Sequence, residues 1–476
     1  MKLTDFANNQ QKTYAIYDNY RSITSFIDGL KPSGRKLVWN SHKFKIFKKV
    51  DTIANATASD TQYLHGPVNM EGVLKGMCND YSGTNLIPLF SKEGFFGTRT
   101  ETEPGASRYI KAKQSDILYK LYRKEDDNVL INQEFEGFKI EPQFYIPILP
   151  TVLINGSSGI GNGFAHDIST RHPKEIAECI FKHLNNKDFN IPLPYFVDFK
   201  GTIIQDIQNN LKFFIKGNFE IKNTTTIIID ELPIGYTLSK YIKTLNILEE
   251  NGVIKNFIDK SNKNKFLFEL KVPRTTSSLS VEQLQKTFSL VTSFTENVTC
   301  IGLKNEIVEY QSIKELLLSY IHIRLKFYNL RKAYRIKELN KVILVLANKI
   351  SFITLVQKGN IDIQNQSKIS FTKQLQEKEF DKVDKSFDYL LNMNFLNLTS
   401  EVLNRLKKEL IKLGEELVSY SEKDIKDMWK DEINELLVAL GEKKIRNKKI
   451  MISNPQSKNK LMEQYVKEEL NIDDLF

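Results

Sequence analysis

The nine residues Asp28-Gly29-Leu30-Lys31-Pro32-Ser33-Gly34-Arg35-Lys36 contain the signals for a turn followed by the start of a helix. Gly29 and Pro32 favour a tight turn, and proline is well tolerated in the first turn of a helix. The residues that follow, 35 to 43, have a helical composition. A turn that leads directly into a basic helix is therefore expected here.

The basic side chains of this stretch gather where the helix begins. Backbone amides at a helix start, together with Lys31, Arg35 and Lys36, suit the binding of phosphate groups. Arg21 precedes the turn and adds a further positive charge. An exposed helix face with solvated charges accounts for the same residues, so the stretch alone does not decide between the two interpretations.

Outside this stretch, the chain divides into three regions with different residue patterns. Residues 1 to 143 mix short helical patterns with glycine-bearing turns and predict a compact α+β domain. Residues 144 to 305 contain β-branched runs interleaved with short helices and predict a second α+β domain. Residues 306 to 476 are mainly helical in period. At 476 residues, several domains are expected.

Two apolar stripes with helical spacing characterise the last region. They consist of Leu316, Tyr320, Ile323, Phe327, Leu330 and Tyr334, and of Leu403, Leu406, Leu410, Leu413, Leu417 and Tyr420. The periodicity breaks between the stripes, which predicts a small globular tip at about residues 357 to 400. Because the chain must return, an antiparallel coiled coil is the simplest packing, and a plain helical bundle remains the alternative.

Composition narrows the class of protein. Lysine and arginine exceed the acids by 68 to 58, giving a formal charge of +10, which makes nucleic acid the first candidate partner without deciding function. Cys78, Cys179 and Cys300 lack paired spacing, so neither a disulfide framework nor a zinc site is indicated. The N-terminus lacks the apolar core of a signal peptide, and we expect no run of about eighteen apolar residues, no membrane contact and a cytoplasmic location.

Tyr109 is a candidate nucleophile. A tyrosine hydroxyl titrates near 10, so attack on phosphorus requires nearby cations or a base. Arg108 is adjacent and permanently charged, and Lys111 and Lys113 follow at a spacing that could hold neighbouring phosphates. A tyrosine packed through its ring, with solvated basic neighbours, is the alternative.

The glycine-rich stretch from Asn155 to Gly163 is a further candidate. The dinucleotide fingerprint would need a glycine where Phe164 stands, and a phosphate-binding P-loop would need a lysine that is absent. A glycine-rich turn could instead present Ile160 as an apolar wedge that unstacks and bends a DNA duplex. A buried isoleucine on a tight turn is the alternative.

Taken in order along the chain, these segments resemble the breakage-reunion subunit of type IIA DNA topoisomerases, the gyrase A and topoisomerase IV A family, and most closely the medium subunit of a T-even-phage enzyme. The matching elements are Asp28 to Pro32, His65-Gly66, Gly94 to Gly97, Arg108-Tyr109, Asn155 to Gly163, Asp230 to Pro233 and Leu390 to Thr399. In Tyr63-Leu64-His65-Gly66, one histidine stands where bacterial members have two.

The resemblance implies an α+β multidomain fold. Residues 1 to 143 would hold an N-terminal arm and a winged-helix cleavage domain, residues 144 to 305 a tower α/β domain, and residues 306 to 476 a long antiparallel coiled coil with a dimerisation tip and a C-terminal tail. The family's catalytic roles would be carried by Tyr109, Arg108, Arg21 and His65. The DNA-binding roles would be carried by Lys31, Arg35, Lys36, Lys111, Lys113, Ile160 and Ser157.

The resemblance also implies an activity and partners. Tyr109 would form a transient 5′-phosphotyrosyl link, and double-strand cleavage, strand passage and religation would give relaxation or decatenation of double-stranded DNA. The chain would act as a homodimer with a toprim/ATPase large subunit that binds Mg²⁺ and ATP, because no toprim or ATPase signature occurs in these 476 residues. The source would be a phage, acting in the host cytoplasm. A non-catalytic winged-helix architectural protein is the alternative function, and a tyrosine recombinase is disfavoured because Tyr109 lies in the first quarter of the chain.

Overall fold

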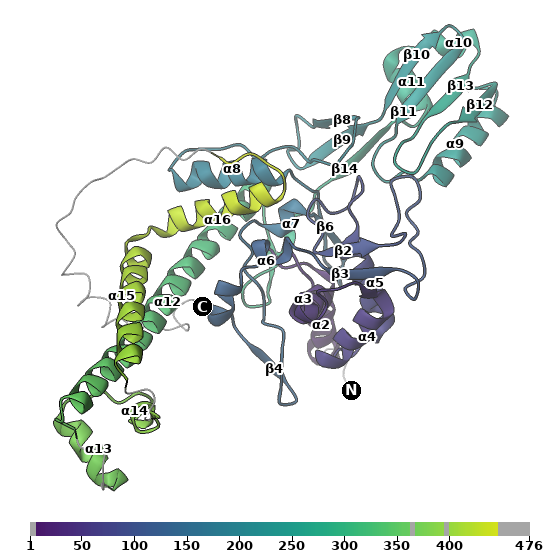
Figure 1. Cartoon of the computed structure of the whole chain (residues 1–476). Helices are drawn as coiled ribbons and strands as arrows, with labels where there is room; N and C mark the ends of the chain where they lie inside the picture. The colour runs from purple at the N-terminus through teal and green to yellow at the C-terminus, as the bar shows by residue number, and fades with distance from the viewer. Residues whose placement is uncertain (1–5, 362–366, 395–398, 446–476) are drawn as a thin grey trace. The chain divides into compact units, whose positions relative to one another are not determined.

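The computed structural model describes residues 6–361, 367–394 and 399–445 (Figure 1). The chain divides into two compact units, Met1–Arg324 with Lys430–Phe476, and Leu325–Trp429. The expected domain boundaries at 143 and 305 do not coincide with this division, since both α+β regions belong to the first unit. The expected C-terminal tail, and residues 395 to 398 of the stretch that precedes the last long helix, lie outside the described residues.

Helices and a small sheet form the N-terminal part of the first unit. The helices are η1 (Phe6–Gln11), α2 (Lys12–Ser22), α3 (Pro32–Asn40), η2 (Ser41–Lys43), α4 (Val50–Asp60) and α5 (Pro67–Cys78). The antiparallel sheet has the order β1 (Lys48–Lys49), β3 (Lys111–Gln114), β2 (Phe90–Glu93). Helices α3, α4 and α5 contact one another, and Leu37, Ile53 and Leu74 are completely buried. The winged-helix assignment of this region stays a prediction.

The turn at residues 28 to 31 is formed as the sequence predicts. Gly29 has a φ of +63°, a conformation that side chains with a Cβ rarely adopt, and Pro32 occupies the first turn of α3. The carboxylate of Asp28 accepts a hydrogen bond from the backbone amide of Leu30 at 3.0 Å. This side-chain bond closes the turn from inside and sets the direction in which α3 begins.

A region of short elements follows. It contains α6 (Leu118–Leu121), η3 (Lys124–Val129), β4 (Gln133–Phe135), β5 (Phe138–Ile140), α7 (Thr151–Ile154), β6 (Ser157–Ile160), β7 (Ala165–Ile168) and α8 (Pro173–Leu184). The antiparallel pair β6 and β7 forms a hairpin in which Ile160 is opposite Ala165. The glycine-rich stretch therefore builds this hairpin rather than a nucleotide loop.

Two further sheets follow in the same unit. One has the order β14 (Val291–Thr295), β9 (Lys212–Lys216), β8 (Thr202–Gln205), and the other β10 (Asn218–Asn223), β11 (Thr226–Glu231), β13 (Phe268–Lys271), β12 (Asn256–Asp259). The nearby helices are α9 (Leu238–Glu250), α10 (Arg274–Ser277) and α11 (Val281–Thr287). Ile227, Ile229 and Tyr241 belong to one buried cluster that joins α9 to the four-stranded sheet. The alternating burial along β11 explains why its β-branched residues form a strand.

The helical region begins after the hairpin of β15 (Thr299–Ile301) and β16 (Ile307–Glu309). Its helices are α12 (Ile313–Gln357), α13 (Lys368–Glu377), α14 (Asp388–Leu391), α15 (Ser400–Glu422) and α16 (Ile425–Ala439). Helix α12 is continuous for 45 residues and extends beyond the first apolar stripe, which ends at Tyr334.

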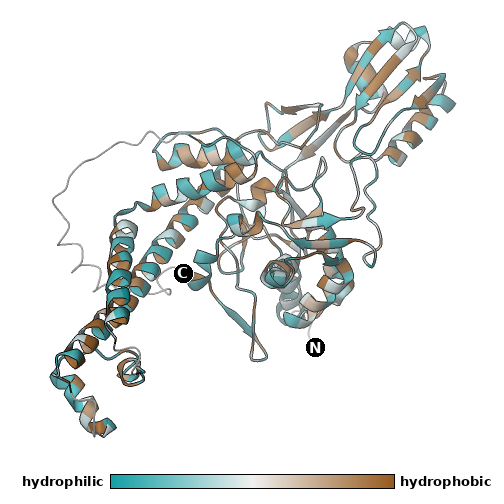
Figure 2. Ribbon diagram, in the orientation of Figure 1, coloured by the Kyte–Doolittle hydropathy of each residue, from teal (hydrophilic) through white to brown (hydrophobic). Residues whose placement is uncertain are grey.

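In the second unit, α12 and α15 run antiparallel. Arg335 pairs with Glu416 at 2.6 Å, whereas Leu346, further along α12, packs with Leu403, near the start of α15. Figure 2 shows both hydrophobic and hydrophilic residues along the two helices, as expected for a pair that buries one face. The predicted antiparallel helix pair is confirmed.

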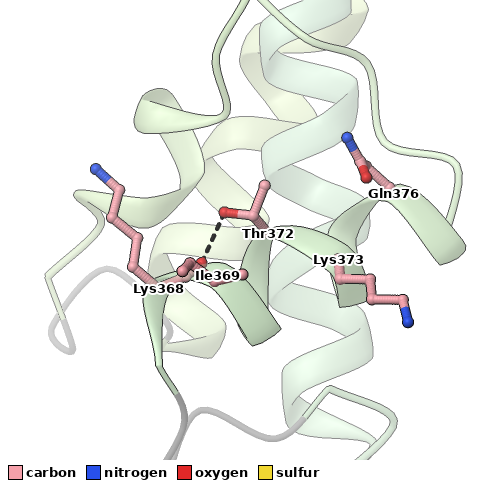
Figure 3. A pocket seen from close by; sticks show the side chains of 5 residues that line it. All are labelled: Lys368, Ile369, Thr372, Lys373 and Gln376. Atoms are coloured by element: carbon pink, nitrogen blue, oxygen red, sulfur yellow. Dashed lines mark hydrogen bonds between the residues drawn. The ribbon is translucent and has the colours of Figure 1, made fainter.

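A separate apolar cluster forms the tip between these helices. It consists of Phe352, Ile361, Leu375, Phe380, Phe387 and Leu390. An open depression lies along α13, lined by Lys368, Ile369, Thr372, Lys373 and Gln376 (Figure 3). The Thr372 hydroxyl donates to the Lys368 carbonyl at 2.7 Å, a bond within the helix itself. None of these lining residues was predicted as part of a site.

Helix α12 is, by length and composition alone, apolar enough to cross a membrane. It does not contain an uninterrupted run of eighteen apolar residues, because polar residues such as Asn348, Lys349 and Ser351 interrupt it. Within the second unit, Ile353 of α12 packs against α15, and Phe352 packs in the tip cluster. The packing of a long helix against its partner and the tip thus accounts for part of this apolar character.

Candidate functional site

Tyr109 lies in a short turn that is held on both sides. The hydroxyl of Ser107 donates to the carboxylate of Glu71 on α5. Ile110, on the other side, is buried, and its carbonyl accepts a hydrogen bond from the backbone amide of Val50 at 3.1 Å. Tyr109 itself is 75% exposed. Two anchored neighbours thus hold an aromatic side chain out into solvent, which excludes the packed-ring alternative for this tyrosine.

The basic residues around Tyr109 differ in their partners. The guanidinium carbon of Arg108 lies 5.2 Å from the centre of the Tyr109 ring, a distance at which a cation and an aromatic face attract. Lys111 pairs with Glu93 at 2.7 Å across the β2–β3 ladder, and both side chains remain substantially exposed. The ammonium of Lys113 lies 5.2 Å from the centre of the Phe47 ring. Arg108 therefore places a positive charge beside the exposed Tyr109 ring, as attack on a phosphate would require, whereas Lys111 and Lys113 contact other residues.

Arg21 and His65 belong to a second group. Nε2 of His65 lies 2.5 Å from the hydroxyl of Tyr17, and the guanidinium carbon of Arg21 lies 5.6 Å from the centre of the Tyr17 ring. The Tyr63 ring meets the His65 ring edge-on. Desolvation and the positive charge of Arg21 lower the pKa of His65 below its ordinary value. This shift favours the neutral imidazole of His65, which can accept a proton.

Ile160 occupies the end of the β6–β7 hairpin and is 85% exposed. This exposure excludes the alternative of a buried isoleucine on a tight turn. A large apolar side chain held in solvent at the end of a hairpin has the form of a wedge.

Ser157 and Lys31 lie at the base of this hairpin. The Ser157 hydroxyl lies 2.5 Å from that of Thr24 and 2.9 Å from Nε2 of His166, while the Lys31 ammonium donates to the Ser158 carbonyl at 2.9 Å. Burial lowers the pKa of Lys31. Burial and the charge of Lys31 lower the pKa of His166 to about 4. Both predicted residues thus engage the protein itself, and they hold the hairpin in place.

The predicted role of Arg35 in DNA binding is wrong as a direct contact. Its guanidinium is 3% exposed and lies 2.6 Å from the carboxylate of Asp28, which is completely buried. It also donates to the Leu30 carbonyl at 3.1 Å. Arg35 is among the buried residues of α3, so its charge stabilises the turn at Asp28 and does not contact a phosphate.

The predicted direct contact of Lys36 with DNA is wrong for the same reason. Its ammonium is buried, lies 2.9 Å from the carboxylate of Glu141 and donates to the Thr61 carbonyl at 2.7 Å. The sequence around Lys36 does not indicate that its partner, Glu141, lies about a hundred positions away. The pairing joins α3 to the segment that follows β5.

Arg99 was missed by the sequence analysis. It is buried, and it donates to the carbonyls of Leu232 at 2.9 Å, Pro233 at 3.1 Å and Tyr236 at 2.7 Å. The loop that follows Gly97 is thus fastened to the Asp230 to Pro233 element. The sequence offered one signal for this contact: Gly94 to Gly97, just before Arg99, and Asp230 to Pro233 are both among the family motifs that the chain matches.

Within residues 6–361, 367–394 and 399–445, no group of three or more His, Cys, Asp and Glu side chains could hold a metal ion. The three cysteines are free and buried.

The comparisons with known proteins agree with this geometry. A family model that describes the A subunit of DNA gyrase/topoisomerase IV matches residues 21–434. The mitochondrial DNA topoisomerase 2 of Dictyostelium discoideum is 31% identical over 472 residues, which is 95% of this chain and 36% of that protein. The DNA topoisomerase 2 of Acanthamoeba polyphaga mimivirus is 27% identical over 513 residues, covering 91% of this chain and 40% of that protein. This chain therefore spans less than half the length of these curated relatives.

The fold is also similar to a solved structure. The crystal structure of the Plasmodium falciparum topoisomerase II DNA-binding, cleavage and re-ligation domain superposes with a TM-score of 0.82 at 27% identity, covering 92% of this chain and 64% of that one. The particular closeness to a T-even-phage enzyme stays a prediction. With a family model that matches most of its length, the chain belongs to the DNA gyrase/topoisomerase IV family of A subunits.

Proposed function

We propose that this chain cleaves and rejoins double-stranded DNA through Tyr109. The observation that carries the proposal is the 75% exposure of Tyr109 beside the Arg108 guanidinium, in a turn anchored by Ser107 and Ile110. Membership of the family and the names of the relatives, DNA topoisomerase 2, support it.

In this proposal the tyrosine oxygen bonds to phosphorus and the bond from phosphorus to the 3′ oxygen breaks. The hydroxyl proton of Tyr109 leaves to a base, and the released 3′ oxygen takes up a proton. The Arg108 guanidinium stabilises the negative charge that develops on the phosphate oxygens. Because the phosphotyrosyl ester conserves the energy of the broken bond, attack by the 3′ hydroxyl reverses the reaction without a further energy source.

Arg21 and His65 are assigned supporting roles in the same reaction. The neutral imidazole of His65 can accept or pass on a proton, and Arg21 can hold a phosphate oxygen. Ile160 is assigned the role of a wedge that unstacks one step of the bound duplex. Lys111 and Lys113 are assigned to the neighbouring phosphates.

The remaining parts of the activity require residues outside this sequence. We assign ATP hydrolysis and Mg²⁺ binding to a toprim/ATPase partner subunit, since the described residues offer no metal cluster. Two copies of this chain would place one tyrosine on each DNA strand, which gives a double-strand break with two-fold symmetry. Relaxation or decatenation by strand passage is the expected outcome.

The test mixes the full chain with a candidate partner, ATP, Mg²⁺ and plasmid DNA, and then denatures the mixture with detergent. The wild-type chain should remain covalently attached to DNA 5′ ends, whereas Tyr109→Phe should bind the same DNA and leave none attached. Covalent attachment by Tyr109→Phe would refute the proposal. If the wild type bent DNA without ever becoming attached, the alternative of an architectural DNA-binding protein would be favoured, for which exposed Ile160 is the specific support.

A further inference from the structure

The hairpin that presents Ile160 rests on helix α2. Strand β6 contacts α2, and the turn of the hairpin is closed by a hydrogen bond from the Gly161 amide to the Phe164 carbonyl at 2.8 Å. A two-stranded hairpin has little stability by itself, so the direction of its end depends on what holds it. The contacts between α2 and this hairpin therefore determine where Ile160 points.

Asn19 makes the central contact. Its Oδ1 accepts a hydrogen bond from the Asn162 backbone amide at 2.7 Å, and its Nδ2 donates to the Asn162 carbonyl at 3.1 Å. The side chain is only 7% exposed. A primary amide that pairs with both polar groups of one backbone residue imitates the pairing of a neighbouring strand, and it fixes both distance and orientation.

The glycines on either side of Ile160 allow this close approach. A Cβ at Gly161 would lie 2.2 Å from Oδ1 of Asn19, and a Cβ at Gly159 would lie 2.2 Å from the Ser22 carbonyl oxygen. Both distances are far below van der Waals contact, so the hairpin backbone lies directly against α2. Because successive side chains of a strand point to opposite faces, Ile160, between the two glycines, points away from α2 and projects into solvent.

The opposite side of α2 carries the His65 group. Tyr17 and Arg21 are one helical turn apart, and Asn19 lies two positions from each, which is about 200° around the helix. Tyr17 contacts His65, and Asn19 contacts the hairpin. One rigid helix thus connects the wedge with the residues assigned to proton transfer.

We propose that Asn19 is a positioning residue that holds the Ile160 hairpin against α2, so that bending of DNA by Ile160 depends on it. The inference rests on the role of Ile160 in the proposed function. The inference identifies Asn19 as the side chain that fixes the position of Ile160. It also implies that α2 couples the position of Ile160 to that of His65.

The first experiment measures hydrogen exchange in the free full-length chain. Asn19→Ala should raise the exchange rate of the Asn162 amide about tenfold, since it loses the bond to Oδ1. Asn19→Asp retains an acceptor and should give an intermediate rate. Asp18→Asn, a change at the adjacent position of the same helix, serves as the matched control and should leave the rate unchanged. An unchanged rate in Asn19→Ala would overturn the inference.

The second experiment measures bending of a short duplex with donor and acceptor dyes at its ends, without Mg²⁺ and therefore without cleavage. Asn19→Ala should lose the bending signal to the extent that Ile160→Ala does, and the double variant should lose no more. Gly161→Ala, whose added Cβ would lie 2.2 Å from Oδ1 of Asn19 and would disturb the same contact from the hairpin side, should reproduce the loss if Asn19→Ala proves too unstable to purify. Full bending by Asn19→Ala alongside lost bending by Ile160→Ala would contradict the positioning role.

The bending result and the cleavage result are separable. If Ile160→Ala bends the duplex normally, the wedge assignment fails, and the role given to Asn19 fails with it, even where covalent attachment through Tyr109 is observed. If covalent attachment is absent but bending is lost in both variants, the proposed cleavage fails and the positioning role of Asn19 stands.

Discussion

The hydroxyl of Tyr17 lies 2.5 Å from Nε2 of His65, joining helix α2 to the loop that precedes α5. Tyr17 was not among the residues selected from the sequence. One turn further along the helix, Arg21 lies over the face of the Tyr17 ring, so tyrosine, arginine and imidazole form one contiguous group. This bond fixes the ring orientation of the histidine, and several expectations depend on it.

Replacing Tyr17 with phenylalanine removes the hydroxyl and leaves the ring in place. We expect the rate of DNA cleavage to fall about tenfold, because the imidazole loses one hydrogen bond that holds it, with little change in DNA affinity. Pre-steady-state cleavage and equilibrium binding measure the two quantities. Tyr14→Phe alters an exposed tyrosine on the same helix and is the control. Equal cleavage rates in the two variants would show that the Tyr17 bond has no role.

Replacing Arg21 with glutamine removes a positive charge near His65. Because desolvation and this charge both lower the pKa of His65, the variant should raise that pKa toward its ordinary value without fully restoring it. NMR titration of ¹³C-labelled histidine rings measures the change. The wild-type imidazole should protonate at a lower pH than that of the variant. A pKa of His65 that stays the same or falls in Arg21→Gln would contradict the electrostatic account.

His166 should make folding stability depend on pH. Its pKa is lowered from 6.5 to about 4 by burial and by the charge of Lys31, so the unfolded chain binds more protons between these values. Stability should therefore fall as the pH decreases from about 6.5 to about 4, by at most about 3 kcal/mol. His166→Gln should lose this part of the pH dependence when thermal midpoints are compared. Parallel profiles for variant and wild type would exclude the effect.

Arg35 and Lys113 should behave differently on substitution. Arg35→Met leaves the buried Asp28 carboxylate without its cation and should cost about 3 to 5 kcal/mol of stability in urea unfolding. Lys113→Ala should be nearly neutral in stability but should lower the salt dependence of DNA binding by about one phosphate contact. A stable Arg35→Met protein with weakened DNA binding would restore the original surface assignment of Arg35.

The sequence was sufficient to predict elements that depend on local signals. The turn at Gly29, the start of α3 at Pro32 and the antiparallel pair of α12 and α15 follow from turn chemistry and apolar spacing. The exposure of Tyr109 and Ile160 agrees with the roles that their motifs predicted.

Long-range polar pairing could not be predicted in the same way. Lys36 looks like a surface cation in the sequence, and its partner Glu141 lies 105 positions away. Asn19 and Asn162 are 143 positions apart, so no local pattern connects them. Such contacts depend on how separate segments pack, which single-sequence periodicity does not report.

The most direct test of the central claim identifies the side chain that carries the DNA. The wild-type chain, stalled on DNA with its partner and denatured, is digested with nuclease and protease, and the peptide that retains a nucleotide is sequenced by mass spectrometry. We predict a 5′-phosphate ester on the Tyr109 oxygen and an unmodified peptide from Tyr109→Phe. A nucleotide found on any other residue, or on the 3′ side of the break, would contradict the account.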